Sequence, residues 1–131
     1  MANVDKTVTN VALVRETGTA VTAVALTSDA GNNTETLIIT PTCPANRIIL
    51  IVNEVSGGGT MTVNCAAGDY WMALAMTEVE VEKSTSKAFI FQAAMHKDKD
   101  DNTIEVVIAP ASGKKLKTDH GATWQIMQMP D

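Results

Sequence analysis

Residues 47–65 contain the stretch that decides the fold: Arg47-Ile-Ile-Leu-Ile-Val-Asn53, then Ser56-Gly-Gly-Gly-Thr60, then Met61-Thr-Val-Asn-Cys65. The first segment is a continuous apolar run bounded by turn residues, which predicts a strand covered on both faces at the centre of a sheet. The glycines can adopt positive φ and predict a turn. The third segment alternates apolar and polar residues, as a returning strand does. We therefore predict a β-hairpin over this stretch.

Further apolar segments, short and rich in β-branched residues, follow one another at intervals of about ten residues, the spacing of a β-sandwich or barrel. They predict strands at residues 7–14, 20–26, 35–40, 72–76, 79–82, 89–92, 104–108 and 124–129. The sequence gives little support for helices. The sequence therefore predicts an all-β protein, an antiparallel β-sandwich that is jelly-roll-like or immunoglobulin-like. Trp71 follows both cysteines instead of lying between them, which fits a true immunoglobulin domain poorly.

The length of 131 residues fits one domain, so we predict a single β-sandwich over residues 1–131. A fraction of 45% apolar and 19% charged residues is that of a chain that folds. Residues 1–9 are polar and lack a core pattern. They are either an N-terminal arm that reaches a neighbouring molecule or a frayed end.

The chain carries fifteen acidic and ten basic side chains, a net charge of −5, which argues against nucleic acid as a partner. Lys114, Lys115 and Lys117 form one basic cluster, expected in a solvated loop. No basic segment leads into an apolar stretch at the start, and no run approaches the length of a membrane span. We expect a soluble protein with no export signal and no membrane partner, and a polar turn at the sequon Asn32-Asn33-Thr34.

Candidate catalytic groups are few. His96 and His120 are the two possible bases near neutral pH, and both lie in charged segments predicted to be exposed loops. No nucleophile signature surrounds Cys43 or Cys65, and their spacing suits neither zinc nor a disulfide scaffold, although one bridge between them stays open. Cys65, on an alternating strand, is predicted to be a small core residue. We predict no catalytic, cofactor-binding or metal-binding residue.

An oxygen-rich loop, Asp98-Lys99-Asp100-Asp101-Asn102, invites a calcium hypothesis. An EF-hand loop opened at Asp98 would need glycine at position 103 and glutamate at position 109, where this chain has Thr103 and Ala109. The interleaved lysines also neutralise the carboxylates. A solvated charge run is the better interpretation, and a weak cation site near Asp98–Asp101 stays open.

The last predicted strand carries apolar side chains on both faces, with Trp124 and Ile126 on one and Met127 and Met129 on the other. Such a strand is either central in a sheet or covered by another subunit. We favour the core interpretation on ordinary burial preferences.

The order of these features resembles the small head decoration (cement) proteins of tailed bacteriophages, over residues 20–129. The likeness lies in a Thr/Val-rich opening, the apolar strand ending in Val52-Asn53, the Gly-rich hairpin, Val63-Asn-Cys-Ala-Ala-Gly-Asp69, the Val/Glu strand, Phe89-Ile-Phe91 and Ile104-Glu-Val-Val-Ile108. The likeness lies in the order in which strands and turns follow one another along the chain.

The resemblance implies a β-sandwich that binds the major capsid protein lattice on the outside of a capsid and stabilises the shell. It also implies a homo-oligomer, often a trimer at symmetry axes, made in the host cytoplasm and carried on the virion. It transfers no catalytic residue and no cofactor.

Two other function classes stay open. A soluble carbohydrate- or ligand-binding module would stack sugar rings on Tyr70, Trp71 and Trp124, although aromatic residues make up 4% of the chain. A small enzyme would use a cysteine or histidine site, which the motif searches above do not support.

Overall fold

The computed structural model describes residues 4–8, 12–13, 18, 20–40, 48–65, 79–90 and 103–128. These residues form strands and no helix. The strands are β1 (Val4–Val8), β2 (Ala12–Leu13), β3 (Val24–Ala25), β4 (Glu35–Ile39), β5 (Ile48–Asn53), β6 (Met61–Cys65), β7 (Val79–Val81), β8 (Ser86–Ile90), β9 (Ile104–Ala109) and β10 (Thr123–Gln128). In this part of the chain no helix is long and apolar enough to cross a membrane.

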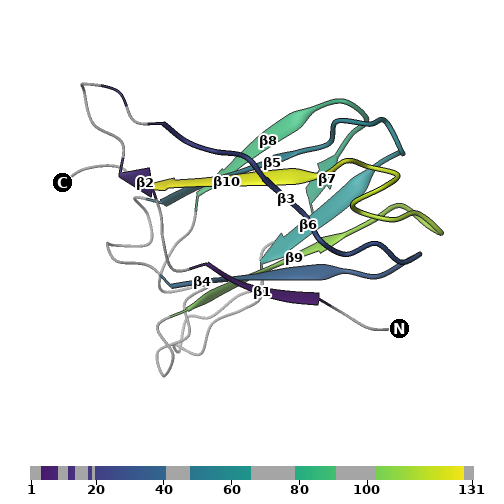
Figure 1. The fold of residues 1–131 in the computed structure, drawn as a ribbon, viewed down its shortest axis with the longest axis horizontal. Coiled ribbons are helices and arrows are strands. Elements are labelled where there is room, and N and C mark those ends of the chain that lie inside the picture. The colour runs from purple at the N-terminus through teal and green to yellow at the C-terminus, as the bar shows by residue number, and fades with distance from the viewer. Residues whose placement is uncertain are drawn as a thin grey trace.

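The strands form two sheets stacked face to face (Figure 1). Four antiparallel strands make up most of sheet A, in the order β4-β9-β6-β7, and four make up most of sheet B, in the order β3-β10-β5-β8. The two N-terminal strands add to these sheets in parallel, β1 beside β4 and β2 beside β10. The predicted all-β antiparallel sandwich is confirmed.

The strand pairing is that of a jelly roll. Strand β3 pairs with β10, β4 with β9, β5 with β8 and β6 with β7, so the chain from β3 to β10 is one long antiparallel hairpin of nested pairs. The pairings β5–β10 and β6–β9 roll this hairpin into two sheets. Of the two sandwich types that the sequence left open, the structure has the jelly roll.

The predicted hairpin over residues 47–65 is wrong. Strand β5 belongs to sheet B and β6 to sheet A, so the glycine-rich segment 54–60 crosses from one sheet to the other. Each of the two strands has one buried face, with Leu50 on β5 and Val63 on β6 among the residues that line it. The segment between them is long enough to span two sheets about 10 Å apart. The two strands lie in different sheets because this arrangement buries the apolar face of each strand.

Several strand limits also differ from the prediction. The strand predicted at residues 7–14 is two strands, β1 and β2, which lie in different sheets. Within the segment 1–9, residues 4–8 pair with β4 of the same chain. Strand β8 begins at Ser86, before its predicted start at Phe89. The strand predicted at residues 72–76 lies outside the described residues.

The core lies between the two sheets and is filled by every second residue of the longer strands. Strand β5 lies between β10 and β8, as predicted for a central strand, but its outward residues Ile49 and Ile51 are half-buried instead of fully covered. Strand β10 is also interior, and Trp124 and Ile126 point into the core, which confirms the core interpretation for that face. Cys65 is fully buried, as predicted.

Candidate functional site

Four loops at one end of the sandwich, on the right in Figure 1, form a continuous layer that we call the loop cap: residues 26–34, 54–60, 82–85 and 110–122. Backbone hydrogen bonds tie each loop to the next. The amide of Asn32 donates to Lys114 O (3.1 Å), that of Ser56 to His120 O (2.8 Å), and that of Glu54 to Thr85 O (2.9 Å). The loop cap is therefore one hydrogen-bonded unit.

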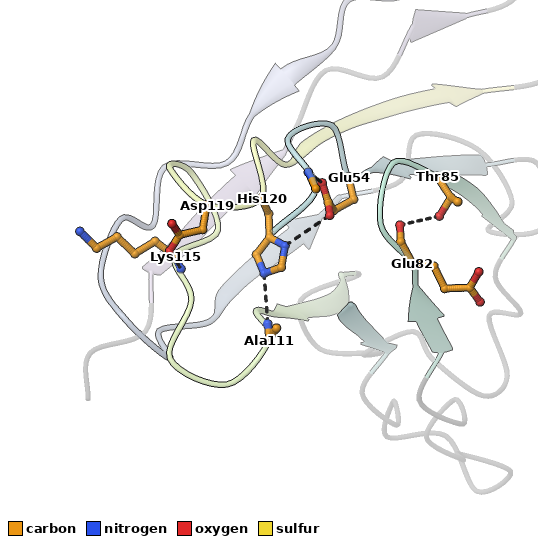
Figure 2. Close-up of polar contacts among 8 residues, drawn as sticks. Glu54, Glu82, Thr85, Ala111, Lys115, Asp119 and His120 are labelled. Carbon is orange, nitrogen blue, oxygen red and sulfur yellow. Dashed lines mark hydrogen bonds and ion pairs between the residues drawn. The ribbon is translucent and has the colours of Figure 1, made fainter. Parts of the chain in front are cut away.

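The centre of the loop cap holds a buried histidine and a buried glutamate (Figure 2). His120 is 0% exposed and Glu54 is 2% exposed. His120 Nδ1 lies 3.7 Å from Glu54 Oε2, and His120 Nε2 accepts a hydrogen bond of 3.1 Å from the amide of Ala111. Glu54 Oε1 accepts a hydrogen bond of 2.7 Å from the amide of Gly57. The pair thus joins loop 54–60 to loop 110–122.

The prediction that His120 is an exposed loop residue is wrong. The residue does lie in a loop beside charged side chains, but its ring turns inward, where it has an amide donor and a carboxylate neighbour. The carboxylate of the adjacent Asp119 has a different partner, since it accepts a hydrogen bond of 2.8 Å from the amide of Lys115. His96, the other predicted exposed histidine, lies outside the described residues.

A second buried carboxylate, Glu35, begins β4 and is 0% exposed. Its Oε1 accepts three hydrogen bonds: from the amide and the hydroxyl of Thr27 (2.7 and 3.0 Å) and from the amide of Ser28 (2.8 Å). Glu35 therefore holds the start of loop 26–34 against the core. The Glu35 carboxylate is closed to solvent in the same way as the Glu54–His120 pair, although Thr27 beside it is exposed.

The buried side chains of His120, Glu54 and Glu35 hold the loops together and are poorly placed to react with a ligand. A general base must reach the proton that it removes, whereas His120, Glu54 and Glu35 are all buried and bound to backbone amides. Among the described residues no group of three or more His, Cys, Asp or Glu side chains is placed to hold a metal ion. The loop of the calcium hypothesis, Asp98–Asp101, lies outside them.

The rim of the loop cap is charged and exposed. Lys114, Lys115 and Lys117 are solvated, as predicted. The hydroxyl and amide of Thr118 donate to Asp29, and the hydroxyl contact is the main cause that lowers the pKa of the Asp29 carboxyl below its ordinary value. Because the folded state has the lower pKa, this contact stabilises the cap at neutral pH and is lost as the pH falls through that pKa.

Cys65 is a free thiol at the end of β6. Burial, and secondly the charge of Glu105, raises its pKa to about 12. The thiolate is the form that reacts with electrophiles, so a nucleophilic role does not suit this residue. Cys43, its possible disulfide partner, lies outside the described residues.

The native Cys65 thiol is expected to resist alkylation. At pH 8 it is thiolate in only about one molecule in ten thousand, roughly a thousandfold less than an unperturbed thiol. In a Cys43→Ser background, iodoacetamide should modify Cys65 at least about a hundredfold more slowly in buffer than in urea. Mass spectrometry of quenched time points measures both rates. Equal rates in the two solvents would contradict the buried position.

The aromatic residues considered for sugar stacking are not gathered on a described surface. Trp124 is 7% exposed and packs in the core, so it offers no face to a sugar ring. Tyr70 and Trp71 lie outside the described residues. The carbohydrate-binding alternative therefore loses one of its three rings.

The outer face of sheet B carries an apolar strip. Across three adjacent strands, Ile49 lies directly beside both Met127 and Ile90, and the next outward row places Ile51 beside Gln125 and Ala88. Ile90 is 68% exposed. The third row is polar and uncharged, since Asn53 donates to Thr123 and accepts from Ser86. We call Ile49, Ile51, Ala88, Ile90, Gln125 and Met127 the outer strip.

Sheet A presents a different outer face. Its outward positions include exposed Glu80 and Glu105, together with half-buried Thr62, Asn64 and Val107. Acidic side chains therefore lie on this face, whereas the three rows on β5, β8 and β10 contain none. The two faces of the sandwich are chemically distinct.

No protein-family model, no curated protein and no solved structure matches this chain.

Sequence analysis missed Glu35, Glu54 and the outer strip. The sequence does contain a signal for the two carboxylates, because alternate residues of a strand point to the same face. Glu35 lies at alternate positions with Leu37 and Ile39, and Glu54 does so with Leu50 and Val52. Each glutamate therefore continues the buried face of its strand. The outer strip needs the strand order, which places β8 beside β5.

Proposed function

We propose that the protein is a non-enzymatic structural protein of a virion, which binds the outer surface of a phage capsid and stabilises the shell. The outer strip is the observation that carries this proposal. It combines an Ile90 side chain that is 68% exposed with the half-buried apolar side chains of Ile49, Ile51 and Met127, on a chain of net charge −5. Exposed apolar sheet surface of this kind is typical of a contact with another protein.

The loop cap supports a structural role. Its buried carboxylates and imidazole accept hydrogen bonds from backbone amides and hold the loops rigid. A rigid sandwich loses little conformational entropy when it docks. The resemblance of the strand and turn order to head decoration proteins points in the same direction.

Stabilisation of the shell follows from mass action. A protein that binds the assembled shell and not its separate subunits adds its binding free energy to the stability of the shell. The outer strip has six side chains, fewer than the about 20 residues that one side of a stable interface contributes. Each single contact is therefore weak, and a homo-oligomer, such as a trimer, would hold through several contacts at once.

Co-sedimentation tests the proposal, with empty shells assembled from the major capsid protein of the virus whose genome carries this gene. The wild-type protein should pellet with shells, and Ile51→Lys on the outer strip should weaken this binding at least about tenfold, by burying a charge. Val107→Lys is the matched control, because Val107 is equally half-buried on the outer face of sheet A. A wild-type protein that stays in the supernatant would overturn the proposal.

A further inference from the structure

The Glu54–His120 pair has a property that goes beyond adhesion, because the two ring nitrogens of His120 face groups of opposite kind. Nε2 faces the amide N–H of Ala111 at 3.1 Å, and Nδ1 faces the carboxylate of Glu54 at 3.7 Å (Figure 2). A neutral imidazole has one N–H and one acceptor nitrogen. Since Nε2 accepts from Ala111, the ring proton is assigned to Nδ1, where it points to Glu54.

We propose that His120 is a proton-sensitive latch within loop 110–122, where the ring holds Ala111. In the neutral ring, Nε2 accepts from the amide of Ala111 and so closes loop 110–122 on itself, while Nδ1–H faces the Glu54 carboxylate of loop 54–60 at 3.7 Å. Protonation adds a proton to Nε2, and its new N–H then faces the N–H of Ala111. The acceptor of that amide is lost, while the attraction to Glu54 is retained and increased by the positive charge. The Ala111 side of the latch opens and the Glu54 side does not.

The surroundings of the ring single out Glu54 as its electrostatic partner. Of the described charged groups on the four loops, Glu54 makes an ion-pair contact with the ring. The carboxylate of Asp119 binds the amide of Lys115, and that of Asp29 binds Thr118. From loop 82–85, Lys83 lies against Gly57, and Glu82 is exposed.

The latch acts locally because the rest of the histidine is held separately. The carbonyl oxygen of His120 accepts from the amides of Val55 and Ser56 at 3.1 and 2.8 Å, and neither bond involves the ring. The amide of His120 donates to Lys115 O at 3.1 Å. Protonation of the ring therefore leaves the backbone contact between the two loops in place and releases the segment at Ala111.

NMR on the intact protein tests the latch. The chain has two histidines, so nitrogen shifts of the two rings resolve easily, and a His96→Gln variant assigns them. At neutral pH we expect His120 to be the Nδ1–H tautomer. As its ring protonates, hydrogen exchange of the Ala111 amide, corrected for the intrinsic effect of pH, should accelerate about tenfold, as for loss of one hydrogen bond. The Ser56 amide should keep its protection.

A non-titrating variant provides the control. In His120→Gln, the side-chain oxygen can accept from the Ala111 amide, and protection of that amide should no longer change with pH. If this variant does not fold, the wild-type measurement stands alone. An Nε2–H tautomer, a ring that stays neutral until the protein unfolds, or an Ala111 amide that keeps its protection when the ring protonates would each overturn the latch.

Discussion

Replacing Gly58 with alanine is expected to destabilise the protein by about 3 kcal/mol, at the upper end of the cost of overpacking. An added Cβ at this position would lie 2.7 Å from the carbonyl carbon of Asp119 and closer still to its oxygen. Both atoms belong to backbone, so the contact cannot be relieved by a rotamer change. The two loops would have to separate at the point where Glu54 meets His120.

The matched control is Gly31→Ala. Gly31 also lies in the loop cap without a positive φ, but the nearest atom to its added Cβ is Gly113 O at 3.5 Å, an ordinary contact. This variant should be neutral or stabilised by up to about 1 kcal/mol through the unfolded state. Urea unfolding followed by tryptophan fluorescence measures both. Similar stability of the two variants would show that the loops do not approach each other as closely as described.

Replacing Glu35 with alanine is expected to cost about 3 kcal/mol of unfolding free energy, because the donors on Thr27 and Ser28 lose their acceptor. Glu35→Gln keeps a side-chain oxygen in the same place and should cost about 1 kcal/mol. Glu80→Ala, on the exposed face of β7, should change stability by less than about 0.5 kcal/mol. Urea unfolding at pH 7 ranks the three variants.

The ranking itself is informative. If Glu35→Gln were as destabilising as Glu35→Ala, the negative charge would matter more than the three hydrogen bonds. If Glu35→Ala were as stable as Glu80→Ala, the Glu35 carboxylate would not anchor loop 26–34, and its hydrogen bonds would not stabilise the loop cap.

The alternation of apolar and polar residues predicted the strands well, because burial of one face is a local property. Strand β6 was predicted at its observed limits, and β5, β9 and β10 to within one residue. Alternation does not report which strand is the neighbour. The segment Ser56–Thr60 shows this, since a glycine-rich turn between two strands is equally compatible with a hairpin and with a crossing between sheets.

The buried polar groups show a second limit of sequence reasoning. Glu54 continues the core parity of Leu50 and Val52, so its burial could be predicted from β5 alone. The burial of His120 could not, because its partners come from loop 54–60 and from Ala111 at the far end of its own loop. Contacts of that kind depend on how the four loops meet once the two sheets have formed.

The nested pairing of the strands has a consequence for how the chain reaches its native state. Strands β6 and β7 form the innermost pair, while β3 must wait for β10, the last of the described strands in chain order. Contacts between such distant parts of a chain carry a high loop-closure cost, and proteins rich in them fold slowly. We therefore expect assembly to proceed from the middle of the sequence outward, with β4 lacking its antiparallel partner until β9 has been synthesised and β3 unpaired until β10 has been synthesised.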